Sequence, residues 1–82
     1  MFPVKWSPSA SADLVDWLFT HPNRVDEIDE AAEKIHEQLV HDPIGSGNHV
    51  SEGLWRIQSG PLAVLYSVDG NEVSIAAVHW LG

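Results

Sequence analysis

After its first six residues, the hydrophobic pattern of this 82-residue chain changes its period once along the sequence. Up to Leu39 the apolar residues recur at steps of three and four, which is the spacing of one face of an α-helix. From Leu54 onwards they alternate with other residues, as in β-strands that bury one face. A chain of this length builds one hydrophobic core, so we expect a single domain over residues 1–82 in which helices pack on a sheet.

The first half of the chain predicts two helices. Ser7 and Pro8 mark the first start, because Ser caps free N–H groups and Pro suits the first helical position. His21-Pro22 ends that helix, since the residue before Pro avoids helical geometry. The second helix ends at Asp42-Pro43 and has one apolar seam, formed by Val25, Ile28, Ala32, Ile35 and Leu39. A connection this short makes the two helices lie side by side and antiparallel.

Four strands are predicted, over residues 2–6, 54–58, 62–68 and 73–81, and residues 44–53 are expected to form a loop. Ser59-Gly60 and Asp69-Gly70-Asn71 have the composition of tight turns, so the last three strands form an antiparallel meander. The predicted class is α+β, with the order β-α-α-β-β-β: a four-stranded antiparallel sheet with an N-terminal helix hairpin on one face. The edge that the first strand joins is left open.

The second face of this sheet has no covering element, which makes it the candidate binding surface. Strict alternation turns Trp55, Ile57, Leu62, Val64 and Tyr66 towards the helices. A small apolar centre with a polar rim is the anatomy of an interface. Trp80 has two interpretations, as a core residue or as part of this face, and we count it among the candidate partner-binding residues: Arg56, Gln58, Ala63, Leu65, Ser67 and Trp80.

The charge of the chain disfavours direct binding to nucleic acid. Lys and Arg number 4 against 12 Asp and Glu, for a net charge of −8, whereas nucleic-acid binding is driven by cations that neutralise phosphates. Anionic membranes are disfavoured for the same reason, and no apolar run reaches the roughly 18 residues of a membrane span. An acidic composition is also typical of proteins from a salty cytoplasm, where screening makes the sign less informative about partners.

The absence of cysteine excludes disulfides, thiolate zinc sites and a cysteine nucleophile. A small domain without such links, and without a signal peptide, is expected in the cytoplasm. Glu37 and His41 lie one helical turn apart, but a metal site needs three or four converging ligands, so we predict no metal and no cofactor. The glycines of Gly45-Ser46-Gly47 lack the strand–helix context of a phosphate loop.

Several segments together resemble the RelE/ParE family of bacterial toxins. Gly53-Leu54-Trp55-Arg56-Ile57, Gly60-Pro61 and Val64-Leu65-Tyr66-Ser67-Val68-Asp69 are similar to the family signature G-x-R-x…G-x-x-R-V-L-Y-x-V-D. The opening Trp6-Ser7-Pro8 is similar to the W-S-P-x-A start, and Asp42-Pro43 and Val78-His79 are similar to the D-P…G region and the V-x-H-R-R ending. The resemblance spans nearly the whole chain and implies a helix hairpin on an antiparallel sheet.

This resemblance implies a bacterial type II toxin of the plasmid-stabilisation kind, neutralised by a small antitoxin. Members of the RelE branch cleave mRNA on the ribosome with basic residues on the open sheet face, and ParE members poison DNA gyrase. Carried over to this chain, the candidate catalytic residues are Arg56, His79 and Tyr66. Gln58 and Ala63 stand where the family has basic residues, and Gly82 is reached without the usual C-terminal Arg and Tyr.

We therefore expect a toxin-like protein that acts by binding other proteins. The expected partners are a cognate antitoxin, a protein target such as DNA gyrase, and a second copy of the chain. One alternative is a ribosome-dependent mRNA endoribonuclease. Another is an inactive family member that only binds a partner.

Overall fold

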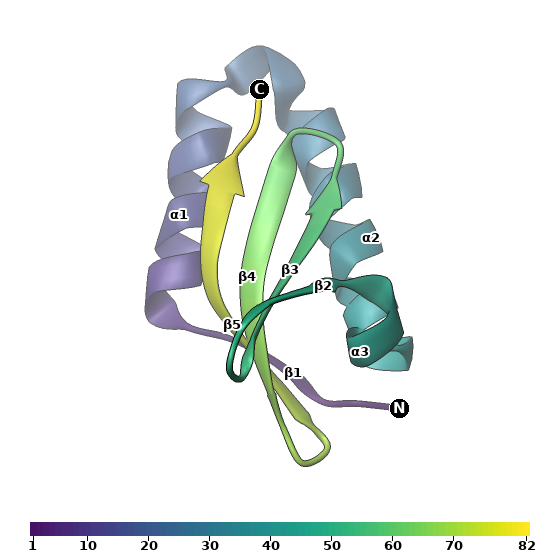
Figure 1. The fold of residues 1–82 in the computed structure, drawn as a ribbon. Helices are drawn as coiled ribbons and strands as arrows, with labels where there is room; N and C mark the ends of the chain where they lie inside the picture. The colour runs from purple at the N-terminus through teal and green to yellow at the C-terminus, as the bar shows by residue number, and fades with distance from the viewer.

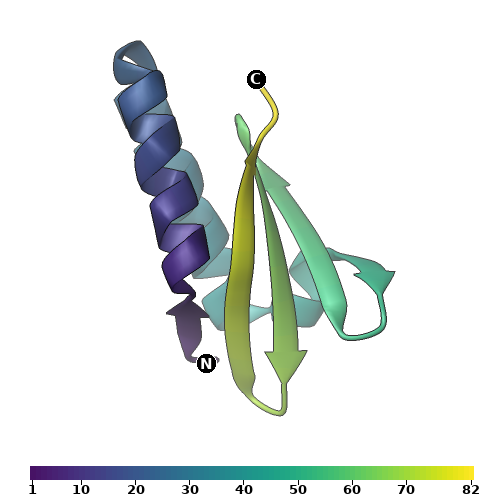
Figure 2. The same ribbon diagram turned by 90° about the vertical axis from the view of Figure 1, so that its left-hand side faces the viewer.

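The computed structural model describes residues 1–82 and confirms the predicted α+β class (Figure 1). Figure 2 shows the two long helices on the same side of the sheet, and the other side lacks a helical cover. The elements in chain order are β1 (Val4–Trp6), α1 (Pro8–Thr20), the 3₁₀ turn η1 (Pro22–Arg24), α2 (Val25–His41), α3 (Pro43–Ser46), β2 (Asn48–Ser51), β3 (Leu54–Ser59), β4 (Leu62–Asp69) and β5 (Glu72–Trp80).

The sheet has five strands in the order β1-β5-β4-β3-β2, so the predicted count of four is wrong by one. The β3-β4-β5 meander is antiparallel, as predicted. The first strand, however, pairs parallel with β5, with Val4 opposite Val73 and Trp6 opposite Ile75, which makes the sheet mixed. The antiparallel α1–α2 pair brings the chain back to the end of the sheet where α1 begins. The strands of the meander then alternate in direction, and the last of them, β5, runs parallel to β1.

The additional strand is β2, which lies within the segment that was expected to be a loop. It pairs with β3 through Asn48 opposite Arg56 and His49 opposite Trp55. All four of its residues are exposed, so no alternation of apolar and polar residues reveals it in the sequence. The readable signal is Glu52-Gly53, a two-residue turn directly before β3 in which Gly53 has a φ of 73°.

The start of α1 and the stop of α2 have local causes in the structure, whereas the start of α2 has no side-chain cap. The Ser7 hydroxyl accepts a hydrogen bond of 3.0 Å from the Ala10 N–H, and Pro8 is the first residue of α1. Asp42-Pro43 ends α2 and also begins α3, where the Asp42 carboxylate accepts a hydrogen bond of 2.9 Å from the Gly45 N–H. The same cap-and-proline pattern therefore predicts a helix at both places, and the short α3 was missed because the pattern was interpreted only as a stop.

The core lies between the helix pair and the inward face of the sheet. α1 packs on β5, and α2 packs on β3 and β4. The predicted seam of α2 is confirmed at Ile28, Ile35 and Leu39, whereas Val25 at its start is 37% exposed. The buried residues that form this core cluster are Ala10, Ile28, Ala31, Ile35, Leu39, Ile57, Leu62, Val64, Tyr66, Val73, Ile75 and Val78.

Side chains of α1 take the place of a strand along part of the β5 edge. β1 pairs with β5 only as far as Ile75, so the rest of that edge has no strand neighbour. There the Val78 N–H donates to the Asp13 carboxylate at 3.2 Å, and the Trp17 indole N–H donates to the Val78 carbonyl at 3.1 Å. Both backbone groups of Val78 are therefore satisfied, which fixes α1 against this edge.

The burial of α2 predicts the effect of truncating its central residue. Ile35 is 0% exposed, so Ile35→Ala removes buried methyl groups and leaves a cavity. We expect a loss of about 2–5 kcal/mol in the free energy of unfolding. Urea denaturation measures this, with the exposed Glu33→Ala as the control on the same helix. Equal losses in the two variants would contradict the packing of α2 on the sheet.

Candidate functional site

Three strands build the face of the sheet that points away from the helices. Register places Gln58, Ala63 and His79 in one row across β3, β4 and β5. It places Arg56, Leu65 and Ala77 in the next row. Residues opposite each other in a sheet share a face, so five of the six predicted partner-binding residues lie together here. We call the following residues the open face: Arg56, Gln58, Ala63, Leu65, Ser67, Ala77 and His79.

The apolar part of the open face differs from the prediction. Ala63 was expected to be exposed at its centre, yet it is 1% exposed, because its methyl group lies between the longer side chains of Gln58 and His79. Leu65 is half-buried, and Ala77 beside it is a further apolar residue outside the predicted set. The apolar surface is therefore formed by Leu65 and Ala77. Ala63 is buried between the polar side chains next to them.

A β-bulge in β5 determines which of its side chains reach the open face. Leu65 lies opposite Ala77 but Tyr66 lies opposite Ile75, so Ala76 is an extra residue on that strand. The extra residue reverses the alternation, and His79 consequently points to the open side. Without the bulge, one face would continue from Ile75 to Ala77 and His79.

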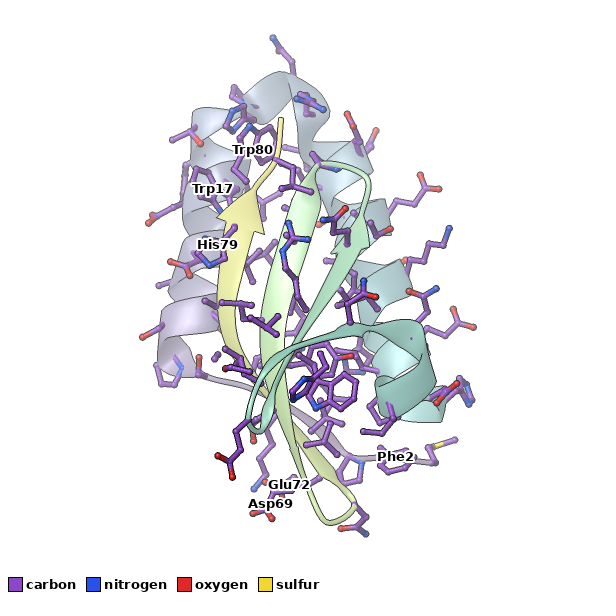
Figure 3. The ribbon with its side chains drawn as sticks, viewed as in Figure 1. Phe2, Trp17, Asp69, Glu72, His79 and Trp80 are labelled. Carbon is purple, nitrogen blue, oxygen red and sulfur yellow. The ribbon has the colours of Figure 1, made fainter.

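Trp80 lies on the helix-covered face, which confirms its interpretation as a core residue and contradicts its inclusion in the open face. It is opposite the buried Leu62, and its ring centroid lies 5.8 Å from that of Trp17 (Figure 3). The His21 ring stacks on Trp80 with centroids 3.8 Å apart, and the Arg24 guanidinium lies 4.9 Å from the Trp80 centroid. The bulge is the cause, because it returns this end of β5 to the core side.

Tyr66 is separated from the other two candidate catalytic residues. Its side chain is 0% exposed on the helix-covered face, and its hydroxyl donates a hydrogen bond of 2.6 Å to the Pro43 carbonyl. A Cβ at position 47 would collide with this hydroxyl, which explains the glycine there. The structure thus brings Arg56 and His79 to one face and places Tyr66 behind it, in a structural role.

Arg56 carries the unpaired positive charge of the open face. No carboxylate lies within ion-pair distance of its guanidinium, although the chain has 12 acidic residues. Its neighbour is Gln58, whose amide oxygen, assigned to face the guanidinium, accepts from Arg56 Nη2 at 2.8 Å. By contrast, Arg24 binds Glu27 through two hydrogen bonds, which lower the pKa of that carboxyl. Arg56 therefore keeps donors that an external anion can use.

The structure lacks the features of a metal centre and of a membrane-spanning helix. No group of three or more His, Asp or Glu side chains is arranged to hold a metal ion. Neither long helix has an apolar stretch of the length that a bilayer crossing requires.

The buried hydroxyl of Tyr66 predicts a loss of stability at alkaline pH. Burial, and secondly the Asp42 charge, raise the pKa of Tyr66 to about 12, against about 10 in the unfolded chain. Between these values the unfolded chain releases the proton and the folded protein keeps it, so stability falls as pH rises. Near pH 11 this costs about 1 kcal/mol relative to neutral pH.

Urea denaturation of wild type and Tyr66→Phe from about pH 8 to about pH 11 tests this. At neutral pH the variant is less stable by about 1–3 kcal/mol, since the Pro43 carbonyl loses its buried partner. The variant should lack the alkaline loss. Parallel curves across the whole range would contradict a buried, protonated Tyr66.

Comparison with known proteins gives a clear result for the fold. No family model matches the sequence, and no curated protein is similar to it. Among solved structures, the toxin–antitoxin complex RelBE2 from Mycobacterium tuberculosis has a chain 21% identical to this one, with a TM-score of 0.76 and 96% of each chain covered. A chain of the chromosomal ParDE system of P. aeruginosa is also 21% identical, with a TM-score of 0.74, and the match covers 100% of this chain and 98% of that one. The YoeB–YefM complex from Staphylococcus aureus has a chain 19% identical, with a TM-score of 0.61 and coverages of 98% and 97%. As the sequence predicted, this chain has the fold of the RelE/ParE superfamily of toxins.

Proposed function

We propose that this protein is the toxin-like component of a bacterial type II toxin–antitoxin module of the plasmid-stabilisation kind, and that it acts in the cytoplasm by binding proteins. The observation that carries the proposal is the open face. On a fold shared with toxin–antitoxin proteins, it combines the half-buried Leu65 and Ala77 with an Arg56 that has no carboxylate partner.

The chemistry of this face defines the partner segment that fits it. Leu65 and Ala77 offer an apolar contact, and Gln58, Ser67 and His79 form a polar rim. The Arg56 guanidinium is a planar donor that favours a carboxylate over a neutral group. An amphipathic antitoxin helix with an apolar side chain and an Asp or Glu one turn away meets both requirements.

A protein target such as DNA gyrase fits the charge better than RNA does. Phosphate binding requires clustered cations, and here Gln58 and Ala63 occupy positions where the resembling toxins have basic residues. A net charge of −8 adds repulsion from ribosomal RNA.

The alternative is a ribosome-dependent endoribonuclease. It is favoured by the presence of Arg56 and His79 on one face, as a cation and a proton-transfer group. A family member that only binds its partner would use the same surface without a toxic target.

Induction of the protein alone in a bacterial host separates these functions. We expect growth arrest with intact mRNA, relieved by co-production of the cognate antitoxin, which is expected to be the product of a small adjacent gene. Arrest with codon-positioned mRNA cuts that disappear in Arg56→Ala would establish the endoribonuclease instead. Normal growth, with binding to the adjacent product retained, would indicate the member that only binds.

The open face predicts a variant that separates binding from folding. Leu65→Asp places a charge in the apolar centre, where complex formation would leave it desolvated and unpaired. We expect the affinity for the adjacent gene product to fall by about 2–4 kcal/mol, which is about 30- to 1,000-fold in Kd.

Calorimetric titration measures this affinity, and a thermal melt shows that the variant is folded. Ile44→Asp is the matched control, because Ile44 is 49% exposed on α3 and lies outside the open face. Unchanged binding by Leu65→Asp would exclude the open face as the interface. Unfolding would mean that Leu65 belongs to the core.

A further inference from the structure

The turn between β4 and β5 forms an exposed tip at one end of the sheet. Its residues are Asp69, Gly70, Asn71 and Glu72, and the first three are exposed. Figure 1 shows this hairpin extending past the helices, and Figure 3 places Asp69 and Glu72 at its end. Register pairs Asp69 with Glu72, so Gly70 and Asn71 are the two residues of a tight turn. Water therefore reaches the turn freely.

The Asp69 carboxylate has no partner in the folded protein. It accepts no hydrogen bond and forms no ion pair, whereas Glu72 opposite it is bound by Lys5 at 3.3 Å. By contrast, Asp13 and Asp42 each accept a hydrogen bond from a backbone N–H. A carboxylate that no cation or donor holds is free to turn towards the backbone of the next residue.

Gly70 supplies an unhindered backbone nitrogen directly after this carboxylate. The Gly70 N–H makes no backbone hydrogen bond, because the residue lies in the turn between the two strands. Glycine has no side chain to crowd its own nitrogen, and its φ of 62° is one that other residues rarely adopt. Every other Asp of the chain precedes a residue with a side chain. The two requirements of an intramolecular attack on a carboxyl group therefore meet at this position alone.

We propose that Asp69–Gly70 is a site of spontaneous isoaspartate formation in the folded protein. The Gly70 nitrogen bonds to Asp69 Cγ, and one carboxyl oxygen leaves as water with the amide proton and the carboxyl proton. The product is a five-membered cyclic imide, which water then opens at either carbonyl. Opening at Cγ restores aspartate, and opening at the backbone carbonyl carbon yields isoaspartate. The mass is unchanged, and water is the only co-reactant.

The neighbouring Asn71 is a poorer site for the same chemistry. The nitrogen that follows it belongs to Glu72, which has a side chain and is paired with Asp69 across the hairpin. The reaction at Asp69 needs no partner protein, so it does not depend on the proposed function.

The modification changes the backbone at the end of β4. Isoaspartate adds one methylene to the main chain, which disturbs the Asp69–Glu72 pair that closes the turn. Glu72 also binds Lys5 of β1, and the Val73 N–H next to it donates to the Pro3 carbonyl at 2.9 Å. The first strand is thus attached beside the altered turn. We therefore expect the isoaspartate form to melt at a lower temperature than the unmodified protein.

Incubation of the purified protein for several weeks at neutral pH and physiological temperature measures the reaction. Peptide mapping separates the aspartate and isoaspartate peptides of equal mass, and an isoaspartyl methyltransferase labels only the second. We expect isoaspartate to accumulate at Asp69 several-fold faster than at Asp26, an exposed Asp followed by Glu27. Equal accumulation at the two positions overturns the proposal, as does a reaction at Asp69 that occurs only when urea unfolds the protein.

Two substitutions at this position test the ring chemistry. Asp69→Glu should form several-fold less of the branched product, because its longer side chain would have to close a six-membered ring. Asp69→Asn should react faster than wild type, because ammonia leaves a side-chain amide more readily than water leaves a carboxyl group. Thermal melts show that both variants are folded. A Glu variant that forms the branched product as fast as wild type overturns the proposed mechanism.

Discussion

The contact between α1 and the edge of β5 organises the rest of the molecule. β1 covers only the first part of that edge, and beyond it the Asp13 carboxylate and the Trp17 indole satisfy both backbone groups of Val78. An unsatisfied edge would be a template for pairing with other chains. Because the same side chains attach α1 to this side of the sheet, α2 is left to cover β3 and β4. One face of the sheet is thereby closed, and the other stays available for a partner.

The few cations of the chain give that available face its chemical character. Lys5 pairs with Glu72, and Arg24 is held by Glu27 and by the Trp80 ring. Arg56 has no such partner and is supported by Gln58 alone. In a protein with three times as many acidic as basic residues, a free guanidinium beside Leu65 does little for stability. Its arrangement is explained if the compensating carboxylate comes from another molecule.

Periodicity predicted the elements that bury one face, and it failed where a residue is exposed or bonded unusually. The α2 seam and the inward residues of β4 follow from their spacing, because burial of one face imposes that spacing. β2 escaped prediction since all its residues are exposed. The place of Trp80 depends on one extra residue at Ala76, and no pattern in the sequence marks that bulge. Asp13 lies off the apolar positions of α1 in the sequence, yet it accepts a hydrogen bond from β5 across 65 positions of sequence.

The acidity of α2 has a physical role in a protein that exposes two apolar surfaces. Leu65 on the open face and the exposed Phe19 on α1 both favour contact with other hydrophobic surfaces, which by itself promotes aggregation. The carboxylates of α2 add repulsion between copies in every orientation that brings two α2 helices together. The orientations that remain favourable bring uncharged surfaces together. The carboxylates concentrated on α2 thus select which contacts this fold can make, and the two apolar surfaces remain separately accessible on opposite sides of the sheet.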